Sequence, residues 1–175
     1  MSLPGGCAIG TRPIDIHLAG LEAMGAKIDL DAGYVHATTP RGLTGAEYLM
    51  PQVSVGATEN LMMAATLARG TTVLHNCARE PEIVDLADCL NAMGARIAGA
   101  GTAHVTIEGV EALHGARHRV IPDRIETGTY VMAAGISRGR IEIAGADSRL
   151  FGDALGKLRA TGLVLDETAD GLIVD

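Results

Sequence analysis

The sequence predicts an α/β fold made of repeated β-α-β-α-β-β units, in which helices pack on one face of small mixed sheets. Three observations support this prediction: an internal repeat, helical segments that end at glycine, and short alternating segments that follow those glycines. The phrase LEAMGAKI at residues 21–28 recurs at residues 90–97 and, more loosely, at residues 158–165. Its glycines, 69 and 68 residues apart, are Gly25, Gly94 and Gly162.

A helix is predicted before each of these glycines. Apolar or small residues lie four, seven and eleven positions before the glycine, and these offsets share one face of an α-helix. In chain order the residues are Leu21, Leu18 and Ile14; Leu90, Ala87 and Ile83; Leu158, Leu155 and Phe151. Each glycine then fits the left-handed conformation that ends many helices, where a side chain would clash.

Alternating apolar and polar residues after these helices predict short antiparallel hairpin strands. The first hairpin comprises residues 27–30 and 34–37 around a turn at Ala32 and Gly33. Residues 104–108 and 171–174 follow the second and third helices in the same way.

The other half of each unit begins with an apolar helix that leads through Arg-Gly into a strand. The predicted helices are residues 58–68 and 127–137, and the strands are residues 71–75 and 140–144. One unit is complete between Thr44 and Gly109. Since the chain opens midway through a unit, we expect a fragment of a longer protein with an incomplete fold.

Composition excludes several classes of protein. The 175 residues carry a net charge of −7, and only four residues are aromatic, so the basic stripe and stacking platforms of a nucleic-acid-binding protein are missing. No apolar run approaches the ~20 residues that span a bilayer, and the N-terminal residues do not resemble a secretory signal. We therefore expect a cytoplasmic protein that binds neither nucleic acid nor membranes.

The potential metal ligands form no recognisable site. Cys7, Cys77 and Cys89 show no CxxC spacing, so neither a zinc site nor a disulfide framework is expected, and Cys77 and Cys89 are predicted to be buried core thiols. The six histidines include no ligand pair on a helix face, and we expect them at the surface or in hairpins. We predict no metal and no cofactor.

Cys7 lies in a loop, residues 3–13, that contains three glycines and two prolines. Arg12 and the helix that begins near Pro13 supply positive charge that favours a thiolate. Such a cysteine can act as a proton donor or as a nucleophile. The alternative, an incidental thiol in a glycine-rich turn, remains open at this point.

Two helix starts are candidate anion sites. Pro13 in the first turn of one helix leaves amides uncapped, with Asp15 close by. Residues 52–60, QVSVGATEN, precede a second helix with small residues that expose several amides. The alternative for this second segment is an ordinary N-cap by Ser54 or Thr58, with Gly56 as a turn.

Four long phrases together resemble bacterial UDP-N-acetylglucosamine enolpyruvyl transferases. They are SLPGGCAIGTRPIDIH at residues 2–17, SVGATEN at 54–60, AREPEIVD at 78–85 and IPDRIETGT at 121–129. The resemblance covers essentially the whole chain, and it implies an inside-out α/β barrel of the enolpyruvyl-transferase type. It also implies transfer of the enolpyruvyl group of phosphoenolpyruvate to the 3-hydroxyl of UDP-N-acetylglucosamine, with release of phosphate, in the first committed step of peptidoglycan synthesis.

The resemblance assigns roles to particular residues. Cys7 matches the lid-loop cysteine that protonates phosphoenolpyruvate and is alkylated by fosfomycin. The stretch that holds the nucleotide end of the sugar substrate is matched by Arg12, Pro13, Ile14, Asp15 and Ile16. A second nucleotide-contacting segment is matched by Ser54, Val55 and Gly56, whereas Gln52 stands where some members carry lysine.

The resemblance also has consequences for the whole chain. Residues 1–120 would be a partial first domain and residues 121–175 one unit of a second, while the family's lysine, arginines and aspartate for catalysis fall outside this sequence. We therefore expect the isolated chain to be inactive and its exposed sheet edges to favour self-association. The alternatives are a non-catalytic repeat module and, more distantly, an enolpyruvylshikimate-phosphate synthase relative, which lacks this cysteine loop.

Overall fold

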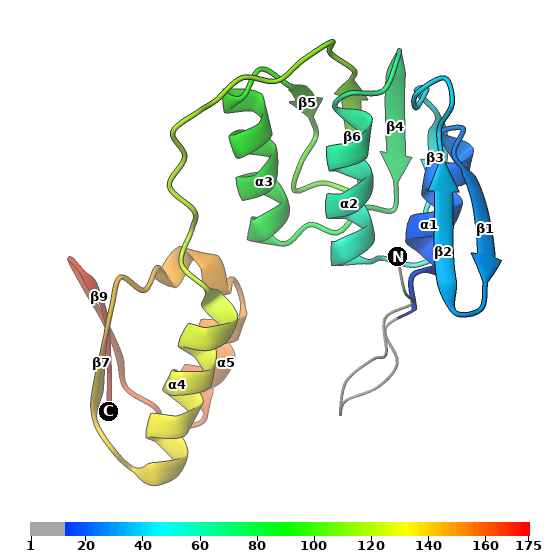
Figure 1. The fold of residues 1–175 in the computed structure, drawn as a ribbon. Helices are drawn as coiled ribbons and strands as arrows, with labels where there is room; N and C mark the ends of the chain where they lie inside the picture. The colour runs from blue at the N-terminus through cyan, green and yellow to red at the C-terminus, as the bar shows by residue number, and fades with distance from the viewer. Residues whose placement is uncertain (1–12) are drawn as a thin grey trace. The chain divides into compact units, whose positions relative to one another are not determined.

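The computed structural model of the chain describes residues 13–175, which form parts of two compact units, Met1–Arg119 and Val120–Asp175 (Figure 1). The first unit opens with helix α1 (Asp15–Ala23) and the hairpin of β1 (Lys27–Asp31) and β2 (Tyr34–Thr38). The predicted hairpin is confirmed, because Ala32 and Gly33 have φ of 47° and 80°, the two positive values that a tight hairpin turn requires.

A complete β-α-β-α-β-β unit follows, as the repeat predicts. Its elements in order are β3 (Glu47–Leu49), α2 (Val55–Ala65), β4 (Thr71–His75), α3 (Pro81–Ala92), β5 (Arg96–Ala98) and β6 (His104–Glu108). The sheet order is β3-β4-β6-β5, with β3 parallel to β4 and the other pairs antiparallel. Helices α2 and α3 lie over one face of this mixed sheet, so the predicted fold class is confirmed (Figure 1).

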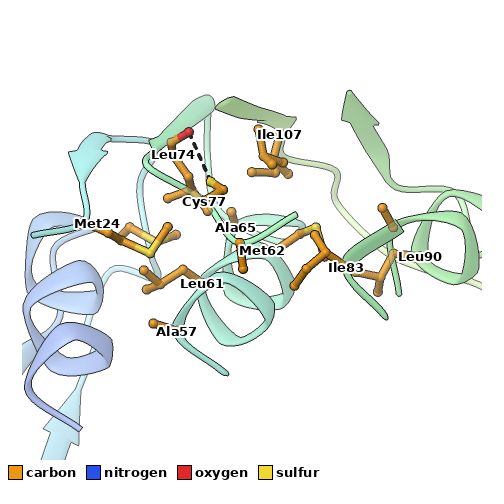
Figure 2. Packing of buried hydrophobic residues seen from close by; sticks show 14 of the residues in the cluster. Met24, Ala57, Leu61, Met62, Ala65, Leu74, Cys77, Ile83, Leu90 and Ile107 are labelled. Atoms are coloured by element: carbon orange, nitrogen blue, oxygen red, sulfur yellow. Dashed lines mark hydrogen bonds between the residues drawn. The ribbon is translucent and has the colours of Figure 1, made fainter. Parts of the chain in front are cut away.

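The core of the first unit lies between these helices and the sheet. Figure 2 shows Leu61 and Met62 of α2 between Met24, which follows α1, and Ile83 of α3. All four side chains are essentially inaccessible to water. Because aromatic residues are scarce, methionine and aliphatic side chains fill this core, and burying each contributes roughly 1.5–3 kcal/mol.

The second unit repeats every element of the β-α-β-α-β-β unit except its first strand. Its elements are α4 (Arg124–Ser137), β7 (Ile141–Ala144), the 3₁₀ turn η1 (Ser148–Phe151), α5 (Ala154–Ala160), β8 (Leu165–Thr168) and β9 (Gly171–Val174). The three strands form an antiparallel sheet in the order β7-β9-β8. A small core comprises Val131, Ala134, Leu155, Leu165 and Val174.

The three repeated glycines confirm their predicted role. Gly25, Gly94 and Gly162 have φ of 93°, 99° and 97°, and each follows a helix. The left-handed backbone at these positions disfavours any residue with a Cβ atom. The same left-handed helix ending therefore occurs in all three copies of the sequence repeat.

Several predicted details were wrong. Helix α2 begins at Val55 rather than Thr58 and ends at Ala65, and α4 begins at Arg124 rather than Thr127. Phe151 lies in η1 outside α5. Ile14 is the N-cap of α1 and not part of its helical face, and the buried residues of this helix are Ile16 and Gly20.

Candidate functional site

The two predicted substrate-binding segments lie at neighbouring helix N-termini. Pro13 and Ile14 lead into α1, whose first two residues are Asp15 and Ile16. Ser54, Val55 and Gly56 form the start of α2. The segments are about forty residues apart in the sequence, but packing of α1 against α2 brings them together.

Three side chains that the sequence analysis did not select join these helix starts. Nδ2 of Asn60 in α2 lies 3.0 Å from Nδ1 of His17 in α1. The hydroxyl of Tyr48 in β3 donates to the carbonyl oxygen of Ile16 at 3.3 Å. These contacts link β3, α1 and α2, and only knowledge of the tertiary packing could have identified them.

Gly56 lies within the first turn of α2, so its predicted alternative as a turn residue was wrong. A Cβ atom at Gly56 would lie 3.5 Å from Cε1 of His17. A larger side chain here would therefore extend into the space beside His17. Glycine keeps this space between the two helix starts open.

The two helix starts are capped differently. Ser54 is the N-cap of α2, and its hydroxyl accepts from the amide of Ala57 at 3.3 Å. Thr58, the other N-cap candidate, instead donates to the carbonyl of Ser54 at 2.8 Å. Ile14, the N-cap of α1, makes no side-chain hydrogen bond to the first turn of that helix.

The electrostatics of the site combine two partial positive charges with one exposed carboxylate. Each helix N-terminus carries roughly half a positive charge and attracts anions. Asp15 is exposed at the start of α1, and burial together with this nearby carboxylate raises the pKa of Tyr48. Tyr48 therefore stays protonated at neutral pH and donates to Ile16.

Cys7 and Arg12 lie outside the described residues, as does the rest of the predicted loop except Pro13. Cys77 is buried as predicted, and its Sγ donates to the carbonyl of Leu74 at 3.4 Å (Figure 2). Burial raises the pKa of Cys77, which makes it a poor nucleophile. The prediction for Cys89 was wrong, because this thiol is only half-buried.

Some histidines are more enclosed than the sequence analysis predicted. Nε2 of His118 lies 2.9 Å from Oδ1 of Asp85, and their side chains are 19% and 14% exposed. Within residues 13–175 no group of three or more His, Cys, Asp or Glu side chains could hold a metal ion. No helix in the same range is long and apolar enough to cross a membrane.

Comparisons with known proteins agree with the resemblance found in the sequence. A family model described as EPSP synthase (3-phosphoshikimate 1-carboxyvinyltransferase) matches residues 1–175. UDP-N-acetylglucosamine 1-carboxyvinyltransferase from Allorhizobium ampelinum is 59% identical over 175 residues, and the protein of that name from Caulobacter vibrioides is 59% identical over 174 residues. Each alignment covers 99% of this chain but 41% of the relative.

Solved structures support the same fold. The enolpyruvyl transferase NikO from Streptomyces tendae superposes with a TM-score of 0.78 at 24% identity, covering 94% of this chain and 42% of NikO. EPSP synthase from Acinetobacter baumannii superposes with a TM-score of 0.67 at 21% identity, covering 93% of this chain and 38% of that structure. At such identities the likeness concerns the fold alone.

Proposed function

Because this chain belongs to the family described as EPSP synthase (3-phosphoshikimate 1-carboxyvinyltransferase), we propose that it serves enolpyruvyl transfer from phosphoenolpyruvate to UDP-N-acetylglucosamine. The observation that carries this choice of acceptor is the 59% identity, over 99% of the chain, to a relative named UDP-N-acetylglucosamine 1-carboxyvinyltransferase. The chain spans about 41% of that relative's length. The acceptor, the donor and the reaction are accordingly proposals for this chain.

The geometry of the two helix starts supports a role in nucleotide binding. A diphosphate carries its charge on oxygens that accept hydrogen bonds, and the N-termini of α1 and α2 offer amides and positive dipole ends. Gly56 allows close approach to the backbone of α2. We assign Arg12, Pro13, Ile14, Asp15 and Ile16, with Ser54, Val55 and Gly56, to the nucleotide end of the substrate.

Cys7 is the proposed proton donor to the methylene carbon of phosphoenolpyruvate. Protonation of this carbon allows the 3-hydroxyl of the sugar to add to the adjacent carbon, which gives a tetrahedral ketal. Loss of a proton from the methyl group and of inorganic phosphate then yields the enolpyruvyl ether. A thiol of moderate pKa on a closing loop suits this step, since proton transfer needs an acid held close to the carbon and away from water.

The two compact units support assigning residues 1–120 to part of one domain and residues 121–175 to one unit of another. Family residues that would bind phosphoenolpyruvate and deprotonate the sugar are not in this sequence. Electrostatic stabilisation of the transition state is usually the largest catalytic effect, so we expect negligible phosphate release from the isolated chain with both substrates. We further propose that the chain acts in the cytoplasm, and that its sheet edges can pair with a second copy.

Labelling with fosfomycin tests the assignment of Cys7. We expect modification at Cys7 rather than at Cys77, whose burial raises its pKa, and we expect UDP-N-acetylglucosamine to increase the labelled fraction. Peptide mass spectrometry locates the adduct, and Cys7→Ser is the control. Equal labelling of the three thiols, or none at Cys7, would favour a non-catalytic module.

The acceptor is tested separately by ligand-observed NMR on the unmodified chain. Saturation transfer to the uridine protons of UDP-N-acetylglucosamine is expected, and Gly56→Leu should abolish it by filling the space beside His17. Gly156→Leu is the matched control, because no atom lies within 4 Å of the position that a Cβ would take at this residue of α5. Binding of shikimate 3-phosphate in place of the sugar nucleotide would reverse the choice of acceptor.

A further inference from the structure

A cavity of about 450 Å³ lies beside the end of α1, between the loop that joins β2 to β3 and the connection from α2 to β4. Three cationic residues line it: Lys27 in β1, Arg41 in the loop and Arg69 in the connection. Within residues 13–175, no acidic side chain lines this cavity, and no ion pair joins any of the three cations to a carboxylate. Positive charge is thus concentrated here without compensation, in a chain whose net charge is −7.

Backbone hydrogen bonds hold the walls of the cavity in place. The amide and the hydroxyl of Thr44 both donate to the carbonyl of Met24, at the end of α1, at 2.9 and 3.3 Å. The amide of Arg69 donates to the carbonyl of Leu43 at 3.0 Å, and its carbonyl accepts from the amide of Gly45 at 2.8 Å. The cavity is therefore formed before any ligand arrives, which reduces the entropy lost on binding.

Arg41 lies in a tight turn of the loop. The amide of Gly42 donates to the carbonyl of Thr39 at 2.9 Å, and Pro40 occupies the second position of this turn, where its fixed φ is favourable. Gly42 itself has φ of 73°, a conformation that suits glycine. The backbone that carries Arg41 is consequently fixed beside the cavity.

The second copy of the sequence repeat has the same junction, but a side chain fills the corresponding space. The amide of His114 donates to the carbonyl of Met93 at 2.9 Å, just as that of Thr44 donates to Met24 in the first copy. A Cβ atom at Gly94 would lie 3.0 Å from Nε2 of His114, so the imidazole lies against the helix end. The smaller Thr44 leaves this space open at the first junction.

The counterpart of Lys27 in the second copy has an acidic partner. Arg96 lies 69 residues after Lys27, and its Nη1 is 3.6 Å from Oε2 of Glu108. Attraction to the negative ends of α1 and α2 would account for Lys27 and Arg69, but not for Arg41 in the loop. The open space and the uncompensated charge occur together at the first junction, so the shared architecture of the repeat does not explain them.

We propose that this cavity binds the phosphate group of a small phosphorylated molecule. A phosphate monoester carries nearly two negative charges at neutral pH and has three oxygens that accept strong hydrogen bonds. The guanidinium groups of Arg41 and Arg69 can each donate two parallel hydrogen bonds to such oxygens, and the ammonium group of Lys27 adds a compact positive charge. The cavity has the volume of a small-molecule site, so part of the organic group fits beside the phosphate.

This cavity is separate from the proposed nucleotide site. The nucleotide-binding segments lie at the N-terminal ends of α1 and α2, whereas the cavity lies beyond the C-terminal ends of the same helices. Helix α1 has nine residues, so its two ends are about 13 Å apart. Failure of one proposal therefore leaves the other intact.

NMR titration of the nitrogen-15-labelled 175-residue chain with ribose 5-phosphate, in a buffer without phosphate, tests the proposal. We expect saturable shifts of the backbone amides of Gly42, Thr44 and Arg69. Inorganic phosphate should shift the same amides, and ribose alone should not. The absence of saturable shifts would overturn the proposal, and so would shifts confined to Val55 and Gly56, which would place the anion at a helix N-terminus instead.

Variants separate the two features of the cavity, its charge and its open space. Arg41→Gln and Arg69→Gln should each weaken ribose 5-phosphate binding by about tenfold, because a charge-assisted pair of hydrogen bonds is lost. Thr44→His introduces the residue type of the second junction, and we expect a similar loss because the imidazole fills the space while all three cations remain. Arg117→Gln removes an exposed cation outside the cavity, and this control should bind as the unchanged chain does.

Undiminished binding by Arg41→Gln or by Thr44→His would overturn the proposal. An equal loss in Arg117→Gln would also overturn it, because the anion would then respond only to the net charge of the chain. Thermal unfolding of each variant ensures that a loss of binding is not a loss of fold.

Discussion

At the scale of single residues, Gly20 controls how closely α1 and α2 pack. A Cβ atom at this position would overlap Cδ1 of Leu61, a side chain with no exposed surface. Leu61 is surrounded by the core and has little room to move. The close approach of the two helices also places His17 beside Asn60. Gly20 therefore helps to position these two side chains of the candidate site.

We therefore expect Gly20→Ala to destabilise the first unit by about 1–3 kcal/mol, the usual cost of overpacking a core. Urea unfolding measures the change. Gly156→Ala in α5 is the control, because nothing lies within 4 Å of its Cβ position and alanine favours helices by about 0.5–1 kcal/mol. If Gly20→Ala were as stable as the unchanged chain, the packing argument would fail.

Glu59 provides a pH-dependent contribution to stability. Burial, and then the nearby carboxylates of Glu82 and Glu80, raise its pKa above the ordinary value of 4.5. The folded state thus binds more protons than the unfolded state between 4.5 and the raised pKa. The free energy of unfolding falls as the pH rises through this window, and the loss persists at higher pH.

Replacing Glu59 by Gln removes this loss, so we expect a higher melting temperature at about pH 7. The gain should disappear at a pH below 4.5, where Glu59 is protonated in both states. Glu22→Gln, on the exposed side of α1, controls for the removal of one negative charge from an acidic chain. Differential scanning calorimetry at both pH values measures the melting temperatures of the variant and of the unchanged chain. An equal rise in melting temperature at the two pH values would contradict the expectation.

At the scale of elements, the N-caps determine where helices begin. Oδ1 of Asp123 accepts from the amides of Ile125 at 2.8 Å and Glu126 at 3.0 Å, which fixes the start of α4 at Arg124. The sequence analysis placed this start three residues too late. Its signal was apolar periodicity, which marks the buried part of a helix and misses a polar first turn.

Asp123→Ala should destabilise the second unit by about 0.5–2 kcal/mol, because two amides lose their acceptor. Asp123→Asn keeps a side-chain acceptor, and we expect it to retain most of the stability. Urea unfolding followed through tyrosine fluorescence reports on this unit when Tyr34 and Tyr48 of the first unit are replaced by Phe, which leaves Tyr130 on α4 as the one tyrosine. Equal losses in the two variants would show that the charge, rather than the cap, is what matters.

Features encoded by neighbouring residues were predictable from the sequence. The left-handed ends of the helices and the hairpin turn at Ala32 and Gly33 are each determined by residues that are close together in the sequence. The buried face of α1 was not predictable, because it depends on contact between Gly20 and Leu61, forty-one residues away. The same holds for the candidate site. Sequence motifs identified Ser54 and Gly56, whereas His17 and Tyr48 could be recognised only from the way the helices and strands pack.

At the scale of the whole molecule, the two units have cores of very different size. Within the described residues, the core of the first unit contains 17 buried hydrophobic residues and that of the second contains five. Stability scales with the apolar area removed from water, so the smaller core protects its strands less. The two units are therefore expected to open at different rates.

Hydrogen–deuterium exchange followed by mass spectrometry should show this difference. Amides of β7 and β9 in the second unit are expected to exchange before those of β4 and β6 in the first. The β4–β6 pair lies in the middle of its sheet, and its peptides are the internal reference. Simultaneous exchange of both units would mean that they unfold as one cooperative structure.

Comparison of α2 and α4 has a practical consequence. Leu61 in α2 is fully buried, but Tyr130, which occupies the equivalent place 69 residues later, is 53% exposed, and Ile136 nearby is 90% exposed. Ile136 shares one side of α4 with Ile125 and Met132, which lie eleven and four positions before it and are also exposed. Exposed apolar side chains grouped in this way bind fluorescent dyes, chromatography resins and one another. Preparations of this chain should therefore be kept dilute and handled with a mild detergent, and a substitution such as Ile136→Lys offers a simple route to concentrated samples.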